Sequence, residues 1–173
     1  MYITGHSLGG SLAAAYAAKF FCSSSTELEI IPYTFGAPSV GNDSFADLFD
    51  PANVNFLFSQ SVRCINVRDI MPFAWNNLSG ITTVDYGKVK CPVDLTLGIE
   101  YLERLLILSR VFYSQPPAQL QLKGDDRGTE SFYRKALYQH EPNTYLKSLG
   151  LDPIETAEFY HSRKSEFMLS DTD

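Results

Sequence analysis

Ser7 is framed by glycines near the start of the chain, in the stretch YITGHSLGG. The residues before it are typical of a buried strand, and an alanine-rich segment from Leu8 to Phe21 is typical of a helix. Glycines between a strand and a helix can mark an ordinary turn. The alternative is a nucleophile elbow, Gly-x-Ser-x-Gly, in which a sharp strand-to-helix turn exposes the serine hydroxyl above the sheet. The predicted strand and helix on either side favour the elbow.

Strand-like and helix-like segments continue to alternate after this turn. Further strands are predicted over residues 29–35 and 62–67, with a short helix over 44–49 between them. This alternation indicates an α/β fold with a mostly parallel sheet and flanking helices. A chain of 173 residues with 45% apolar residues is long enough for one hydrophobic core, so we expect residues 1–173 to form a single domain.

The pattern is less regular in the second half of the chain. Residues 81–89 are compatible with a hairpin, 119–128 with a loop, and 131–138 with either a strand or a helix. Asp152-Pro153-Ile154-Glu155 has the composition of a helix N-terminus. Residues 96–113 form a strongly apolar predicted helix. Packing on the sheet is the simpler interpretation of that helix, and a lid that meets lipid is the alternative.

Composition and charge exclude several classes of function. A net charge of −6 offers no basic surface for phosphates, which argues against nucleic-acid binding. The three cysteines and three histidines are scattered, so neither a disulfide framework nor a metal site is expected. No segment has the pattern of a membrane span or of a signal peptide. The sequence is compatible with both a cytoplasmic and a secreted location.

Three motifs occur in order along the first 73 residues: TGHSLGGSLA, TFGAPSVGN and VRDIMPF. In this order they resemble the class 3 lipases, a family of α/β-hydrolases that includes filamentous-fungal triacylglycerol lipases. The resemblance implies an α/β-hydrolase fold, hydrolysis of lipid esters such as triacylglycerol or phospholipid, and no cofactor. It corresponds to the C-terminal part of the family's domain, so the early strands are expected to be missing from an N-terminally incomplete domain.

A nucleophilic serine needs a histidine base that is oriented by a carboxylate. Asp69 follows the strand at 62–67 and matches the Asp-x-x-Pro of the family, so it is the predicted acid; its alternative role is that of an ordinary turn aspartate. His140 is the predicted base, on a loop before a short helix from Pro142, and is favoured over His161. His6, adjacent to Ser7, is expected to point away and pack against the underlying loops.

The oxyanion hole is predicted only in part. The N–H of Leu8 is one expected donor, and in this family the other comes from a loop after an early strand that precedes Met1 in this numbering. Missing early strands would leave a sheet edge and an apolar face uncovered. We therefore expect a homo-oligomer or a second chain to cover them.

The residues predict a serine hydrolase that cleaves carboxylic esters through an acyl-enzyme, with Ser7, His140 and Asp69 as the catalytic residues. A phospholipase or a soluble carboxylesterase is the nearest alternative within the same chemistry. The alternative without catalytic activity is an inactive lipase-like fragment or a module that binds a partner. The expected partners are a lipid or acyl-ester substrate and, through the apolar helix, a lipid interface.

Overall fold

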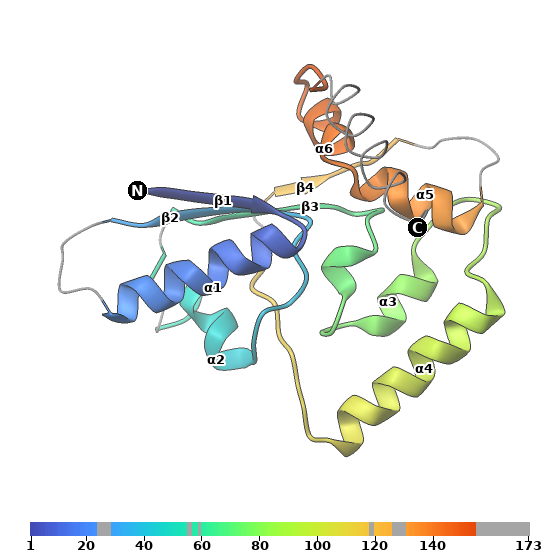
Figure 1. Cartoon of the computed structure of the whole chain (residues 1–173), viewed down its shortest axis with the longest axis horizontal. Helices are drawn as coiled ribbons and strands as arrows, with labels where there is room; N and C mark the ends of the chain where they lie inside the picture. The colour runs from blue at the N-terminus through green and yellow to red at the C-terminus, as the bar shows by residue number, and fades with distance from the viewer. Residues whose placement is uncertain (24–28, 55–56, 59, 118–119, 126–130, 155–173) are drawn as a thin grey trace, which may run out of the picture.

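The chain forms a parallel four-stranded sheet with strand order β1-β2-β3-β4, as the computed structural model shows (Figure 1). The structure describes residues 1–23, 29–54, 57–58, 60–117, 120–125 and 131–154. The predicted α/β class with a parallel sheet is confirmed. The strands are β1 (Tyr2–His6), β2 (Ile31–Phe35), β3 (Val62–Asn66) and β4 (Leu120–Leu122).

Helices flank the sheet on both faces. Helix α1 lies along one face, and α6 lies on the other side of the sheet (Figure 1). Asn42 and Asn77 each accept a backbone hydrogen bond at the start of a short helix, which explains where those helices begin. The helical segments are α1 (Leu8–Ser23), α2 (Asp43–Ala46), η1 (Asp47–Phe49), η2 (Met71–Phe73), α3 (Leu78–Thr83), α4 (Val93–Leu108), α5 (Phe132–His140) and α6 (Pro142–Ser148).

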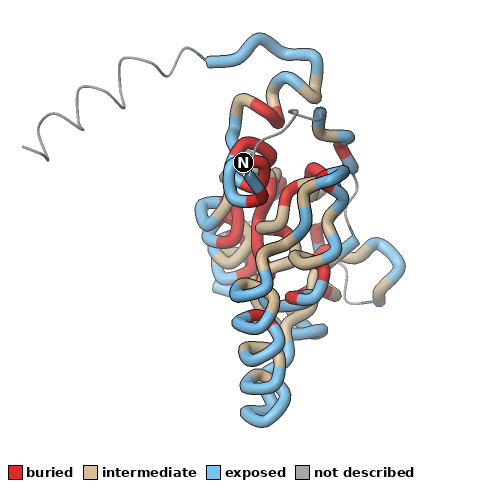
Figure 2. The backbone as a smooth tube through the Cα atoms, turned by 90° about the vertical axis from the view of Figure 1, so that its right-hand side faces the viewer, coloured by how far each residue is buried: buried red, intermediate tan, exposed pale blue. Residues whose placement is uncertain are grey.

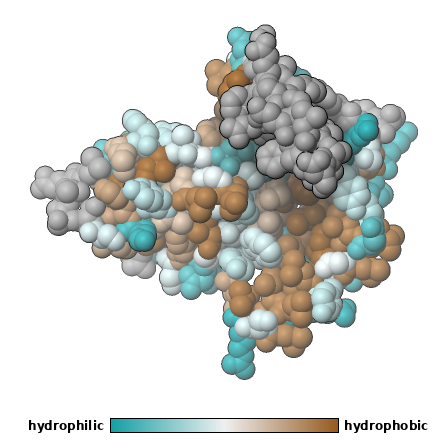
Figure 3. Space-filling model, in the orientation of Figure 1, coloured by the Kyte–Doolittle hydropathy of each residue, from teal (hydrophilic) through white to brown (hydrophobic). Residues whose placement is uncertain are grey.

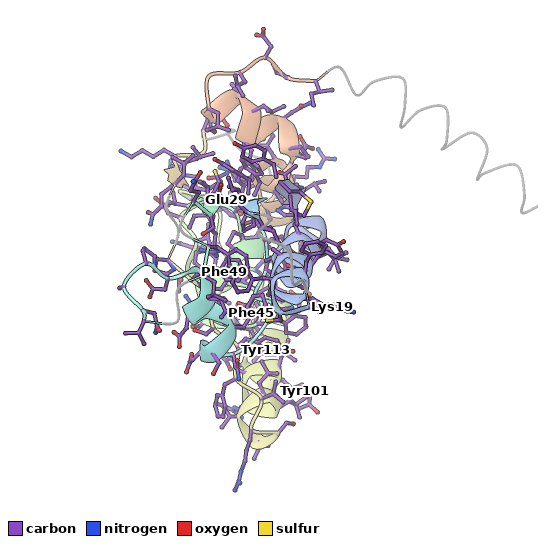
Figure 4. The ribbon with its side chains drawn as sticks, turned by 90° about the vertical axis from the view of Figure 1, so that its left-hand side faces the viewer. Lys19, Glu29, Phe45, Phe49, Tyr101 and Tyr113 are labelled. Atoms are coloured by element: carbon purple, nitrogen blue, oxygen red, sulfur yellow. The ribbon has the colours of Figure 1, made fainter. Side chains whose placement is uncertain are left out.

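Helix α1 packs closely on β1 and β2 because its buried face carries small residues. Gly10, Ala13 and Ala17 recur at helical spacing, and all three are buried. Ala17 and Ala18 form one core cluster with Ile30, Phe49 and Phe58. In Figure 4, the labelled Phe45 and Phe49 lie close to α1 in the body of the molecule. This packing fixes the end of α1 at which Ser7 is found.

Two segments differ from the sequence-based predictions. Leu78–Thr83 is a helix, not the first strand of a hairpin, because Asn77 caps it through the N–H of Gly80. Of the predicted hairpin, the structure has a single bridge between Tyr86 and Val89. The expected loop over 119–128 contains β4, a strand too short for its sequence pattern to identify.

Helix α4 is not packed on the sheet, so the simpler interpretation of this segment is wrong. It packs mainly against α3, and Ile99 is its only buried residue. Most residues of α4 are exposed and most of the others are half-buried, as the blue and tan tube at the bottom of Figure 2 shows. In Figure 4, Tyr101 lies below Phe45 and Phe49. In the part of the chain that the structure describes, no helix combines the length and apolar character that crossing a membrane requires.

The region around His140 also differs in part. Residues 132–140 are helical, and His140 is the last residue of α5, not part of a loop. Proline restrains the residue directly before it, which is Glu141; that residue is extended, with φ −63° and ψ 138°. The helix expected from Asp152 lies mostly outside the described residues, and 152–154 are not helical.

Candidate active site

Ser7 occupies a sharp turn between β1 and α1. Its φ is +57°, in the left-handed region that a residue with a side chain rarely adopts. The N–H of Ser7 donates to the carbonyl of Phe35 at 2.9 Å, and its own carbonyl accepts from Gly10 N at 2.9 Å. The turn is therefore held on one side by the sheet and on the other by the first turn of α1. This is the backbone geometry of the predicted elbow.

The glycines around Ser7 are not equally constrained. A Cβ on Gly5 would lie 2.1 Å from the carbonyl oxygen of Gly9, and one on Gly10 would lie 2.9 Å from that of Gly5. A Cβ on Gly9 would meet no atom within 4 Å. Within the described residues, Gly5 and Gly10 are thus required for close packing of β1 on α1. Gly9, the second glycine of the motif, is not.

The three predicted catalytic side chains meet in one hydrogen-bonded chain. Ser7 Oγ lies 2.7 Å from His140 Nε2, and His140 Nδ1 lies 2.8 Å from Asp69 Oδ2. The three residues come from the β1–α1 turn, the end of α5 and the loop after β3. In Figure 1 the arrowhead of β1 points toward the junction of α5 and α6. The other candidate base, His161, lies outside the described residues.

Asp69 is fully buried and its two oxygens are both occupied. Oδ1 accepts from the N–H of Met71 at 2.9 Å. Oδ2 accepts from His140 and also from the hydroxyl of Tyr145 at 2.7 Å. A buried carboxylate that accepts from three donors is fixed in orientation. It can therefore hold the imidazole of His140 in one tautomer.

Tyr145, in α6, is a site residue that the sequence analysis did not identify. Its hydroxyl donates to Asp69 and accepts from the N–H of Asn66 at 3.1 Å. Burial raises the pKa of Tyr145, and the negative charge of Asp69 raises it further. The hydroxyl therefore stays protonated and remains a donor. An aromatic residue in a short helix after the base carries no motif of its own, so the sequence offered no clear signal.

Asn66 connects the acid loop to the helix that carries the base. Its Nδ2 donates to the carbonyl of Gln139 at 3.0 Å and to Oε1 of the same residue at 2.7 Å. Its Oδ1 accepts from the backbone of Arg68 and Gly124, each at 3.0 Å. Asn66 is 1% exposed, so these bonds replace water completely. The acid and the base are thus positioned by the same buried amide.

The TFGAP motif forms the end of β2 and the turn that follows it. Gly36 has φ +57°, and a Cβ there would lie 2.8 Å from both Asp69 Oδ2 and the Tyr145 hydroxyl. The carbonyl of Pro38 accepts from Ser11 Oγ at 2.9 Å. The motif therefore leaves room for the acid and links the loop after β2 to α1.

His6 does not point away from the site as expected. Its ring lies against that of His140, with centroids 4.6 Å apart and planes at 35°, and meets Tyr145 edge-on at 5.6 Å. The expectation was wrong because Ser7 has left-handed backbone geometry, which changes how adjacent side chains diverge. Burial lowers the pKa of His6, as does the neighbouring His140, with partial opposition from Asp69.

Leu8, the predicted oxyanion donor, is the first residue of α1. N–H groups in the first turn of a helix have no acceptor within the helix and lie at the positive end of its dipole. The Leu8 N–H therefore suits an anion that develops beside Ser7. Together the site has the parts for acyl transfer: a hydroxyl, a base, an orienting acid and one backbone donor.

Comparison with known proteins agrees with this geometry. Residues 1–78 match the family Lipase (class 3). Lipase ZK262.3 from Caenorhabditis elegans is 35% identical over 75 residues, which is 42% of this chain and 19% of that protein. The crystal structure of M37 lipase superposes with a TM-score of 0.69 at 27% identity, over 87% of this chain.

The chain spans only part of these relatives, 45% of the M37 lipase chain and 19% of the nematode protein. The matched family region contains Ser7 and Asp69, whereas His140 lies beyond it. The structural match extends over most of this chain. The resemblance predicted from the three motifs is therefore confirmed: this chain has an α/β-hydrolase fold and is similar to the class 3 lipases over residues 1–78.

Proposed function

We propose that this protein is a serine hydrolase that cleaves the carboxylic ester bonds of lipids. The observation that carries the proposal is the continuous chain from Ser7 Oγ through His140 to Asp69, with separations of 2.7 and 2.8 Å. The first separation lies within the range in which a base takes a proton from a hydroxyl, and the second is that of a hydrogen bond that orients the base. Similarity to lipases supports lipid esters as the substrate class.

The reaction begins when Ser7 Oγ attacks the ester carbonyl carbon and His140 Nε2 takes the hydroxyl proton. The carbonyl oxygen becomes an oxyanion, which the N–H of Leu8 stabilises. The bond to the alkoxy group then breaks, His140 gives its proton to the departing alcohol, and the acyl group stays on Ser7. Water repeats the sequence with His140 as base and releases the fatty acid. Asp69 holds the imidazole and stabilises its charge throughout.

Hydrolysis of nitrophenyl butyrate and nitrophenyl palmitate tests the proposal directly. We expect the full chain to hydrolyse at least one ester, and Ser7→Ala to reduce kcat by about 10³-fold or more. Ser44→Ala, which removes an exposed hydroxyl on α2, is the matched control and leaves the rate unchanged. Equal rates for the wild-type chain and Ser7→Ala would support the inactive-fragment alternative.

Labelling with a fluorophosphonate separates activation of the serine from substrate fit. Only a serine with a working base reacts with this probe at an appreciable rate. We expect one adduct, located at Ser7 by peptide mass spectrometry and absent in His140→Ala. An adduct without ester hydrolysis would point to a substrate other than these two esters. A missing adduct in the folded wild-type chain contradicts the proposal.

The exposed face of α4 is the part of this chain that we propose meets the lipid. Val93, Leu97, Tyr101 and Leu108 lie on one face of the helix and are 60% to 79% exposed; we name this set the α4 stripe. Lys88 and Lys90 precede it and are exposed, which suits a phosphate-bearing surface. Figure 3 shows hydrophobic side chains gathered over α3 and α4.

Phospholipid vesicles test this part of the proposal. The triple variant Leu97→Ser, Tyr101→Ser and Leu108→Ser should co-sediment less with vesicles of phosphatidylcholine and phosphatidylserine. Hydrolysis of soluble nitrophenyl butyrate should stay within about twofold, because these exposed side chains lie away from the triad. Equal vesicle binding by both proteins would exclude the stripe as the lipid contact.

A further inference from the structure

We propose that His6 is a positioning residue for His140, an inference that rests on the proposed function. The ring of His6 lies against the ring of the base, tilted by 35° with the ring centroids 4.6 Å apart, and this contact helps to keep Nε2 of His140 facing Ser7. This assigns a role to His6, the residue directly before the nucleophile. His6 itself touches neither the substrate nor the reacting atoms.

The contact geometry is the first support. His140 is the last residue of α5, and the chain turns sharply into α6 directly after it. Asp69 accepts a hydrogen bond from Nδ1 of His140. This contact by itself still allows the His140 ring to rotate about the hydrogen bond. The ring of His6, at 4.6 Å and 35°, covers one face of the imidazole.

The polar atoms of His6 are the second support. Its Nε2 is buried and has no hydrogen-bond partner among the residues that the structure describes. A protonated ring would place an unsatisfied N–H there, which is costly in a buried position. The groups that face the ring are His140 from α5, Tyr145 from α6 and Asp69 from the loop after β3. Desolvation outweighs Asp69, so the pKa of His6 is lowered.

A neutral His6 matters because His140 becomes positively charged during the reaction. A second positive charge 4.6 Å away would oppose proton transfer from Ser7. A neutral ring in van der Waals contact supports the base without that repulsion. The burial that keeps His6 neutral thus serves the base directly.

Three substitutions separate the effect of the aromatic ring from the effect of the polar nitrogens. His6→Ala removes both, His6→Phe keeps a ring, and His6→Asn keeps a polar group that can hydrogen-bond. We expect His6→Ala to lower kcat for nitrophenyl butyrate about 10- to 100-fold with KM within about twofold, as for other displaced catalytic groups. His6→Phe and His6→Asn should each restore part of the rate. Thr4→Ala, at an exposed position of the same strand, is the matched control.

A proton NMR signal gives a readout that does not depend on turnover. The proton between His140 Nδ1 and Asp69 should resonate at low field in the wild-type chain, be lost to solvent exchange in His6→Ala, and persist in Thr4→Ala. Urea unfolding identifies any variant that does not fold. If His6→Ala does not fold, His6→Phe and His6→Asn carry the test, and both should show a kcat below that of the wild type.

The outcomes distinguish this inference from the proposed function. If wild-type hydrolysis depends on Ser7 while kcat and the low-field signal are unchanged in the folded His6 variants, the inference is wrong and the function stands. If the wild-type chain shows no Ser7-dependent hydrolysis but the signal depends on His6, the function fails and the positioning role stands. A kcat loss in His6→Phe and His6→Asn that only matches their loss of folded protein overturns the inference.

Discussion

Helices α1 and α4 are each 16 residues long, yet they have opposite relations to the core. Helix α1 buries Gly10, Ala13, Ala17 and Ala18, while α4, rich in leucine and isoleucine, buries only Ile99. Small side chains allow α1 to approach the sheet and fix Ser7 at its end. The larger apolar residues of α4 remain on the surface. Burial here follows shape and position in the fold, and apolar content alone does not predict it.

The largest difference between the two regions should appear when a carboxylate is neutralised. Asp69→Asn presents an amide to His140 and favours the wrong tautomer, so we expect kcat to fall about 10³- to 10⁴-fold. Glu103→Gln on α4 removes a carboxylate that accepts from Ser79 N at 2.7 Å and should leave kcat unchanged. Steady-state kinetics with nitrophenyl butyrate measures both. Similar losses would mean that α4 is coupled to the site.

Glycine-to-alanine substitutions at three positions compare the packing of the same regions. Gly5→Ala places a Cβ 2.1 Å from the Gly9 carbonyl oxygen and should displace the elbow, with a loss of activity and of several degrees in Tm. At Gly98 in α4 a Cβ meets no atom within 4 Å, so Gly98→Ala should stabilise the chain by about 0.5–1 kcal/mol. Gly9→Ala should be tolerated. Thermal unfolding orders the three variants, and a stable Gly5→Ala contradicts the close packing.

Changes of side-chain size test the core against the surface. Ala17 is fully buried, so Ala17→Leu should overpack the cluster with Phe49 and Phe58 and cost about 1–3 kcal/mol. Leu97 is 60% exposed, and Leu97→Ala should change stability by less than about 0.5 kcal/mol. Urea unfolding gives both values. A larger cost at Leu97 would show that the α4 stripe is covered in solution.

Removal of a tyrosine hydroxyl should have a smaller effect, confined to the site. Tyr145→Phe removes one of the three donors to Asp69, and we expect kcat to fall about tenfold. Tyr101→Phe on α4 should have no effect. Because the pKa of Tyr145 is raised, its hydroxyl remains a donor up to and beyond its ordinary pKa of about 10. The ratio of wild-type to Tyr145→Phe kcat should therefore be constant between about pH 7 and about pH 10.

The smallest expected effect is the contribution of His6 to the pH dependence of stability. The pKa of His6 is lower in the folded chain than its ordinary value. At pH values between these two pKa values, the unfolded chain therefore binds more protons than the folded chain. The contribution of His6 to the free energy of unfolding is therefore fully present above about pH 6.5 and is lost as the pH falls below that value. The decrease in urea midpoint from about pH 7.5 to about pH 5.5 should be smaller in His6→Phe. An unchanged decrease would show that His6 titrates normally.

Sequence motifs predicted the parts of the site that depend on local backbone geometry. The glycine pattern around Ser7 predicted the turn, and the position of Asp69 after β3 predicted its place at the edge of the sheet. His140 was predicted from the residues next to it in the sequence, and the structure places its ring within hydrogen-bond distance of both Ser7 and Asp69. The sequence failed where a contact depends on another element: His6 was expected to face away, and Tyr145 was not identified.

The sequence by itself determined the α/β class, the elbow and the order of the motifs, because strand and helix periodicity and glycine spacing act over a few residues. Only the tertiary structure decided which side chains meet at Asp69, that the ring of His6 lies against that of His140, and that α4 is not packed on the sheet. Contacts between residues 70 or more positions apart depend on how whole elements pack, and no local pattern contains that information.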